Sequence, residues 1–316
     1  MKHGPYEIVI IGGGPAGMTA GLYACRARMR TLLVEKALCG GQVLVADTIE
    51  NFPGFPEGIK GPDLAEWMFK QASRFGLEVK TSEVTGIEPK KTAAANFKVC
   101  LQGGEIVEAL SLIVAAGANW NHLNIPGEQK LTGRGVSYCA TCDGPLFKGK
   151  DVAVIGGGDT ALEDAIFLTK FARKVTVIHR RDKLRATKIL QERAISNKKI
   201  EFCLNAVAVE IKGSARVEAV AVKDVSTGKP AEVRADAVFV LIGTVPNSEM
   251  VKGMVKMDDK NYILTDDHMR TSVDGIFACG DVRGKLLRQV STAVGDGATA
   301  AFSAERYVES INAGGK

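Results

Sequence analysis

Two cysteines, Cys139 and Cys142, lie two residues apart and are followed directly by Asp143. Thiols at this spacing can close a small disulfide ring and reopen it, so the pair suits a two-electron switch. A zinc site would need two further ligands, and the sequence has neither a second Cys-x-x-Cys nor a His-x-x-x-His pattern. The pair is therefore predicted to be redox-active, with Asp143 as the acid that protonates a departing thiolate. The alternative for Asp143 is a turn residue or helix cap.

The composition excludes several classes of function. The chain of 316 residues is 46% hydrophobic and 24% charged, with a formal net charge of +5, and its length suggests about two domains. Basic residues are dispersed except around Arg180–Arg185, which disfavours nucleic-acid binding, and no apolar run approaches the ~18–20 residues that span a bilayer. Seven cysteines, five of them scattered, do not make a disulfide framework. A cytoplasmic protein without a metal is expected. Four cysteines are expected to be core thiols: Cys25, Cys100, Cys203 and Cys279. Cys39 lies beside Gly40-Gly41, and no redox role is expected for it.

Residues 6–36 carry the strand, glycine turn, helix and strand that surround a dinucleotide-binding turn. In such a turn, Gly12 allows the tight bend, Gly14 lets a pyrophosphate approach the backbone, and Gly17 lets the helix pack on the strand. Glu35, 23 residues after Gly12, is placed to bind a ribose 2′-hydroxyl. The predicted strand is 7–11 and the predicted helix 18–28. The site residues expected in this segment are Gly12, Gly14, Pro15, Ala16, Gly17, Glu35 and Lys36.

The same pattern recurs over residues 151–181. When Gly156 is aligned on Gly12, His179 takes the place of Glu35, and three arginines follow it. A carboxylate would repel a 2′-phosphate, whereas guanidinium groups match it. The first turn is therefore predicted to bind FAD and the second NADPH. The residues expected at the NADPH site are Gly156, Gly158, Asp159, Thr160, Ala161, Glu163, His179, Arg180, Arg181, Arg185 and Gly243.

Both halves of the chain end in an apolar strand that closes on small residues, at 112–117 and at 237–243. The last segment, 261–316, has no counterpart in the second copy. It contains a strand that ends at Asp281 and a predicted helix over 292–308. If this segment returns to the first domain, that domain is discontinuous and the second is inserted into it. The expected fold is then α/β, with two Rossmann-like, three-layer ββα domains. The boundaries predicted are 1–117 with 246–316 for the FAD domain, and 118–245 for the NADPH domain that carries the cysteine pair.

With these residues assembled, the chain resembles the low-molecular-weight, bacterial- and archaeal-type thioredoxin reductases, a class of pyridine nucleotide-disulfide oxidoreductases, over essentially its whole length. The resemblance implies a homodimer in which electrons pass from NADPH through FAD and the cysteine disulfide to a thioredoxin. It also implies that Cys142 faces the flavin and that Cys139 attacks the partner protein. The motifs that carry the resemblance are the two glycine turns, the cysteine pair with Asp143, Gly40-Gly41-Gln42, Asn51–Gly54, His179–Arg181 with Arg185, Gly280-Asp281 and Arg288-Gln289.

The same resemblance implies further FAD contacts. Gln42 and Asn51 would line the flavin side, and Val84 the adenine end. Asp281 would bind the ribityl chain. The other positions implied are Gly41, Gly117, Gly280, Arg288, Gln289 and Ala293.

Fewer than twenty residues separate the cysteines from Gly156, so they belong to the NADPH domain. Nicotinamide and disulfide both need the flavin ring, which predicts a rotation of the inserted domain about hinges at 116–118 and 244–247.

Two other functions suit the same scaffold: an FAD-dependent dithiol oxidase, and a reductase of another small disulfide protein. An oxidase would have no use for the three arginines. Partner recognition is expected to depend on 144–147, where many relatives carry paired aromatics.

Overall fold

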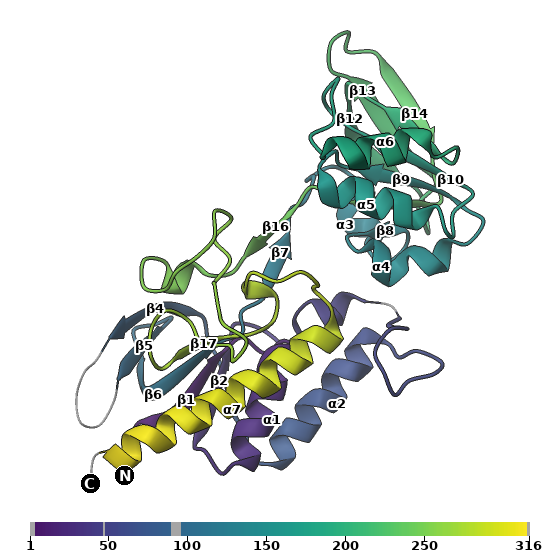
Figure 1. Cartoon of the computed structure of the whole chain (residues 1–316). Helices are drawn as coiled ribbons and strands as arrows, with labels where there is room; N and C mark the ends of the chain where they lie inside the picture. Colours follow the sequence, from purple (N-terminus) through teal and green to yellow (C-terminus); the bar gives the residue numbers. More distant parts are fainter. Residues whose placement is uncertain (1–3, 47, 90–95, 315–316) are drawn as a thin grey trace. The chain divides into compact units, whose positions relative to one another are not determined.

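The computed structural model describes residues 4–46, 48–89 and 96–314, and the chain divides into two compact units. The first unit is Met1–Asn119 with Val245–Lys316, and the second is Trp120–Thr244. Each unit is built on its own sheet with a parallel core (Figure 1). The second unit is thus inserted into the sequence of the first, and the predicted fold class of two Rossmann-like units is confirmed.

The first unit centres on a seven-stranded sheet with the order β3-β2-β1-β6-β5-β4, in which β17 also pairs with β6. The central strands β2, β1, β6 and β17 are parallel, whereas β4 and β5 are antiparallel additions. The strands are β1 (Tyr6–Ile11), β2 (Thr31–Glu35), β3 (Glu78–Thr81), β4 (Val84–Pro89), β5 (Phe97–Leu101), β6 (Ile106–Val114) and β17 (Ile276–Ala278).

Helices α1 (Pro15–Arg26), α2 (Gly61–Arg74) and α7 (Val290–Gly314) cover one face of this sheet (Figure 1). The alternation of β1 explains the layering, because Ile8 and Ile10 pack under the helices while Val9 and Ile11 point into the core on the other face. Helix α7 packs tightly on α1, since a Cβ at Gly297 would lie 2.2 Å from the carbonyl oxygen of Ala16.

The boundaries predicted for two helices of this unit are wrong. Helix α1 starts at Pro15 rather than at residue 18, because proline has no N–H to lose in the first turn of a helix. It ends at Arg26, two residues before Arg28 adopts a φ of 66°. Helix α7 runs from Val290 to Gly314 and so extends the predicted 292–308 at both ends.

The second unit repeats the arrangement with a five-stranded sheet of order β11-β10-β9-β15-β8, all parallel. Helices α5 and α6 lie side by side on this unit, and an antiparallel three-stranded sheet, β12-β13-β14, completes it (Figure 1). The elements are α3 (Glu128–Leu131), β8 (Val136–Ser137), α4 (Ala140–Asp143), η2 (Gly144–Phe147), β9 (Asp151–Ile155), α5 (Asp159–Leu168), β10 (Lys174–Ile178), α6 (Lys188–Ser196), β11 (Ile200–Cys203), β12 (Ala206–Lys212), β13 (Ala219–Asp224), β14 (Pro230–Arg234) and β15 (Ala237–Val240).

The chain passes between the units at two strands, β7 (Ala118–Trp120) and β16 (Thr244–Pro246), which pair with each other. Just beyond β16, the Asn247 backbone N–H donates to the Gly117 carbonyl oxygen at 2.9 Å. Three 3-10 turns complete the first unit: η1 (Gly41–Val45), η3 (Glu249–Val251) and η4 (Gly280–Val282). Among the residues that the structure describes, no helix combines the length and apolar character needed to cross a membrane.

Candidate active site

The first glycine turn joins β1 to α1 and leaves its backbone accessible. A Cβ at Gly17 would lie 1.9 Å from the Gly12 carbonyl oxygen, so only glycine lets α1 approach β1 this closely. Gly14, at the N-cap of α1, has open space where its Cβ would be. The first backbone N–H groups of α1 have no partner within the helix, and they therefore suit an anionic pyrophosphate.

Glu35 ends β2 and turns its carboxylate toward the first glycine turn. Oε2 accepts a hydrogen bond from the Gly13 N–H at 2.6 Å, and Oε1 accepts one from the Ala37 N–H at 3.1 Å. A carboxylate has about four lone-pair positions, so acceptor capacity remains for ribose hydroxyls. The backbone contacts fix the orientation of the side chain.

Two other segments reach the first turn. A Cβ at Gly41 would lie 3.2 Å from the Gly14 Cα, and a Cβ at Gly280 would lie 2.8 Å from the Cβ of Ala16. The turn, the residues around Gly41 and the end of β17 therefore come together, as the dinucleotide-site prediction requires. In the same unit, Gln42 donates to the Ala118 carbonyl oxygen.

Asp281, in η4, presents a buried acceptor atom that suits a ligand hydroxyl. Its Oδ1 atom is buried and has no hydrogen-bond partner within the described part of the chain. Burial raises the pKa of this carboxyl, although the charges of Lys285 and Arg288 oppose the rise. A buried acceptor of this kind is normally satisfied, and a sugar-like hydroxyl chain would satisfy it. These residues fit a flavin dinucleotide.

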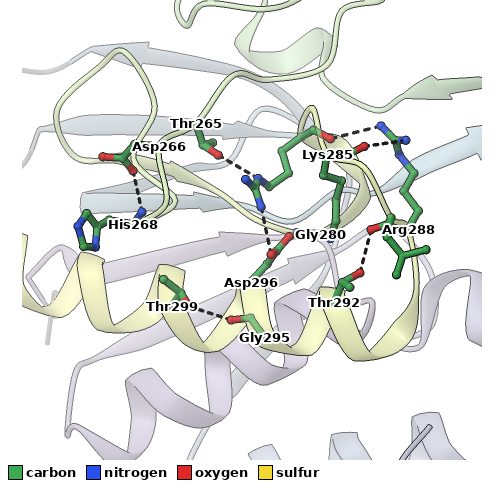
Figure 2. Close-up of polar contacts among 12 residues, drawn as sticks. Thr265, Asp266, His268, Gly280, Lys285, Arg288, Thr292, Gly295, Asp296 and Thr299 are labelled. Atoms are coloured by element: carbon green, nitrogen blue, oxygen red, sulfur yellow. Dashed lines mark hydrogen bonds and ion pairs between the residues drawn. The ribbon is translucent and has the colours of Figure 1, made fainter. Parts of the chain in front are cut away.

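A charged cluster that the sequence did not indicate supports the segment after Asp281. Asp296 on α7 accepts hydrogen bonds from the Gly280 N–H at 3.1 Å, from Arg283 at 3.1 Å and from Lys285 at 2.8 Å (Figure 2). All three side chains are largely buried. The residues lie 11 to 16 positions apart across an irregular segment, so no helical or strand periodicity links them.

Arg288 and Gln289 follow this cluster and precede α7. The Arg288 guanidinium lies 4.2 Å from the centre of the Tyr262 ring. It donates to the carbonyl oxygens of Arg283 and Lys285 (Figure 2). Its Nε is buried without a partner among the described residues. The Asn51 amide donates to the Gln289 side-chain oxygen at 2.9 Å, which joins two of the predicted flavin-side residues. Ala293 is buried one turn into α7.

Val84 and Gly117 take no part in the contacts described above. Val84 begins β4, opposite Leu101, and is partly buried against the core on the face without the three helices. Gly117 has a φ of +68° and precedes β7. Lys36 is exposed directly after Glu35.

The second glycine turn joins β9 to α5. Gly158 caps α5, and the side-chain position of Gly157 is taken by the His179 ring, which would lie 2.3 Å from a Cβ there. Ala161 stands where the first turn has Gly17, and Glu163 and Thr160 are exposed on the first turns of α5. Gly243 accepts a hydrogen bond at its carbonyl oxygen from the Asn121 N–H at 3.0 Å.

The arginines form an exposed rim around this second turn. His179 itself is 6% exposed, and its Nε2 has no partner among the described residues. Burial lowers the pKa of His179, and the neighbouring cations of Arg185, Arg181 and Arg180 lower it further. The ring is therefore neutral at physiological pH, and the positive charge of the rim belongs to the guanidinium groups. The Arg185 Nη2 atom lies 4.0 Å from the Cβ position of Gly158.

Cys139 and Cys142 form a disulfide, with Cα atoms 5.3 Å apart. Cys139 caps the short helix α4, because its Sγ accepts a hydrogen bond from the Cys142 N–H at 3.2 Å. The Asp143 N–H donates to the Cys139 carbonyl oxygen at 3.2 Å. Ala140 and Gly144 are buried around the pair, whereas both cysteines are partly accessible. The geometry therefore presents the disulfide at the surface on a fixed turn.

The other cysteines differ from this pair. Burial raises the pKa of Cys25, of Cys203 and of Cys279, and raises that of Cys39 to about 11. A raised pKa leaves little thiolate at neutral pH, which disfavours redox exchange at these sites. The described residues contain no group of three or more His, Cys, Asp or Glu that could hold a metal ion.

Comparison with known proteins identifies the family. The model of the family described as pyridine nucleotide-disulphide oxidoreductase matches residues 6–297. The thioredoxin reductase of Bacillus subtilis is 46% identical over 307 residues, covering 97% of this chain and 96% of that protein. That of Treponema pallidum is 46% identical over 306 residues, covering 97% and 98%. The crystal structure of thioredoxin reductase from Streptococcus pyogenes matches with a TM-score of 0.93 at 46% identity, covering 97% of this chain and 99% of that one. The chain belongs to the pyridine nucleotide-disulphide oxidoreductase family and, within it, to the low-molecular-weight thioredoxin reductases.

Proposed function

We propose that the chain reduces thioredoxin disulfides with electrons from NADPH, by way of FAD and the Cys139–Cys142 disulfide. Membership of the family implies flavin and nicotinamide cofactors. When bound, the nicotinamide supplies a hydride and the flavin relays two electrons. The observation that carries the proposal is the accessible disulfide in a chain that also holds two dinucleotide turns of different charge.

We assign FAD to the first unit. Gly14 leaves room for the pyrophosphate, Glu35 offers acceptors to the ribose, and the buried Oδ1 of Asp281 suits a ribityl hydroxyl. The remaining residues assigned to this site are Gly12, Pro15, Ala16, Gly17, Lys36, Gly41, Gln42, Asn51, Val84, Gly117, Gly280, Arg288, Gln289 and Ala293.

We assign NADPH to the second unit. The exposed guanidinium groups of Arg180, Arg181 and Arg185 suit a 2′-phosphate, and no carboxylate stands at the position that Glu35 has in the first unit. Charge-assisted hydrogen bonds contribute about 1.5–3 kcal/mol each, so two of them favour NADPH over NADH by about a hundredfold or more. The other residues assigned here are Gly156, Gly158, Asp159, Thr160, Ala161, Glu163, His179 and Gly243.

The cysteines carry the last step. Reduction of their disulfide takes up two electrons and two protons and yields two thiols. The Cys139 thiolate then attacks the partner disulfide and forms a mixed disulfide, which the Cys142 thiolate resolves, so the partner leaves as a dithiol and the ring closes again. Asp143, next to Cys142, is the acid assigned to protonate the thiolate that departs.

The protein is proposed to act as a cytoplasmic homodimer. Each unit holds one of the two cofactors in this assignment, and the disulfide belongs to the unit assigned to NADPH. We therefore infer that the second unit rotates between half-reactions about the residues of β7 and β16.

Anaerobic addition of NADPH to the purified flavoprotein tests the proposal. The visible absorbance of the flavin should disappear in the wild type and also in Cys139→Ser, because the first half-reaction does not need that thiol. A flavin that stays oxidised with NADPH but is bleached by a small dithiol would instead indicate a dithiol oxidase.

A further inference from the structure

The arginine segment of the second unit is tied to the second glycine turn by backbone contacts. The Gly157 carbonyl oxygen accepts hydrogen bonds from the Arg185 N–H at 2.7 Å and from the Ala186 N–H at 3.1 Å. One side chain adds to them: the Oδ1 of Asp159 accepts a hydrogen bond from the Thr187 N–H at 2.7 Å. Thr187 is in turn the N-cap residue of α6.

Asp159 therefore has a different role from a residue that binds a phosphate. It is the first residue of α5, directly after the glycine turn, where a nucleotide phosphate would approach. An ionised carboxylate has no hydrogen to donate, so Asp159 cannot bind that phosphate directly. Its Oδ1 instead accepts from the N–H that follows Ala186, two residues beyond Arg185.

From this geometry, and on the basis of the NADPH assignment above, we propose that Asp159 is a positioning residue for cofactor specificity. It anchors the segment from Arg180 to Thr187 so that Arg185 stays over the glycine turn before the nucleotide arrives. The chemical group whose recognition depends on the anchor is the 2′-phosphate of the adenosine ribose. Phosphate groups on the 5′ side contact the glycine turn itself, so their recognition does not depend on the anchor.

The physical reason is the ordering of the segment. Arg180, Arg181 and Arg185 are exposed, and a long exposed side chain on a mobile backbone loses conformational entropy when it binds. The anchor restricts the backbone of this segment in the free protein, so the segment loses less conformational entropy when the nucleotide binds. Because Gly157 still accepts two hydrogen bonds from the same segment, loss of the anchor weakens 2′-phosphate recognition without abolishing it.

The test uses two adenosine nucleotides that differ by the 2′-phosphate alone: adenosine 2′,5′-bisphosphate and adenosine 5′-monophosphate. Their dissociation constants are measured by calorimetry on the full-length, flavin-loaded protein, so that the first turn is occupied. Asp159→Ala should lower the preference for the bisphosphate about fivefold, which corresponds to about 1 kcal/mol. Any change in 5′-phosphate affinity caused by the lost charge applies to both nucleotides and cancels in this ratio.

Matched variants separate the anchor from charge. Asp159→Asn keeps an oxygen that accepts the Thr187 N–H and should retain the wild-type preference within about twofold. Asp182→Ala removes an exposed carboxylate from the same segment, one for which the described residues provide no hydrogen bond, and should not lower the preference. A fall in Asp159→Asn as large as that in Asp159→Ala would overturn the proposal, because charge and not the anchor would then be the cause.

The donor of the same hydrogen bond gives an independent check. Thr187 has a φ of −58°, which proline can adopt, and its side chain makes no capping hydrogen bond. Thr187→Pro should lower the preference by the same factor as Asp159→Ala, and the double variant should lower it no further. An unchanged preference in Asp159→Ala contradicts the anchor. A wild type without any preference for the 2′-phosphate would instead contradict the NADPH assignment.

Discussion

Adding one methyl group should have different effects at Gly14 and Gly17 of the first turn. At Gly17 it should lower the unfolding free energy, and at Gly14 it should weaken FAD binding. A Cβ at Gly17 would lie 1.9 Å from the Gly12 carbonyl oxygen, where ordinary contact begins at 3.4 Å. Helix α1 must therefore retreat by about 1.5 Å, against the tight packing of Ala16 on Gly297. Such overpacking costs typically 1–3 kcal/mol, and Gly17→Ala should lose about 2–3 kcal/mol of unfolding free energy.

Gly14→Ala places its methyl group in open space. The φ of Gly14 is −72°, which alanine adopts without strain. The unfolding free energy of the flavin-free protein should therefore change by no more than about 1 kcal/mol. The methyl group does, however, occupy the approach of the pyrophosphate to the backbone. Loss of one or two charge-assisted hydrogen bonds should weaken FAD binding by at least about tenfold.

Both quantities are measurable on the same preparations. Urea denaturation of the flavin-free protein gives the unfolding free energy, and FAD titration followed by flavin fluorescence gives the dissociation constant. The second turn has Ala161 at the position of Gly17, so a turn of this pattern can accept a methyl group and the cost at Gly17 stays moderate. A Gly17→Ala protein as stable as the wild type, or a Gly14→Ala protein that retains FAD with wild-type affinity, would refute the reasoning.

Two further predictions concern buried charges. Burial, with a contribution from neighbouring Glu163, raises the pKa of Asp164 to about 6, so the folded protein binds this proton more tightly than the unfolded chain and stability falls as pH rises from about 4 to about 6. Asp164→Asn should match the wild type near pH 4 and exceed its unfolding free energy by roughly 2–3 kcal/mol above pH 7; a difference that does not depend on pH would contradict this assignment. Asp296→Asn leaves Arg283 and Lys285 buried beside a neutral amide, which should cost about 3 kcal/mol and weaken FAD retention. Glu249→Gln breaks an exposed pair with Lys252 and serves as the control, and equal stability of the two variants would exclude a structural role for Asp296.

The sequence predicted the parts of the site that depend on the backbone of the two glycine turns. The spacing of Gly12, Gly14 and Gly17 between two apolar strands predicted a tight turn with close packing of the helix on the strand. The structure has the close packing at Gly17 and open space at Gly14. The equal spacing from each turn to Glu35 and to His179 predicted which side chains meet each turn, because parallel strands bring their carboxyl ends to one edge. The pairing of the two thiols likewise did not depend on distant parts of the chain, since only two residues lie between the cysteines.

Long-range contacts of polar side chains were not predictable. Asp296 meets Lys285 and Gly280 across a segment without regular structure, so no period in the sequence relates them. Asp159 was expected at the nucleotide, and its hydrogen bond to Thr187, 28 residues away, depends on how α5 and α6 pack. The start of α1 was misplaced although Pro15, at the first helical position, is a signal that the sequence carries. The start of α7, at Val290, was misplaced by two residues.

Steady-state reduction of a thioredoxin disulfide tests the central claim most directly. The full-length flavoprotein should reduce the disulfide with NADPH, and about a hundredfold less efficiently with NADH at low concentration. Cys139→Ser should abolish this turnover while its flavin is still bleached by NADPH. Failure of the wild type with every thioredoxin offered, or undiminished turnover in Cys139→Ser, would contradict the account.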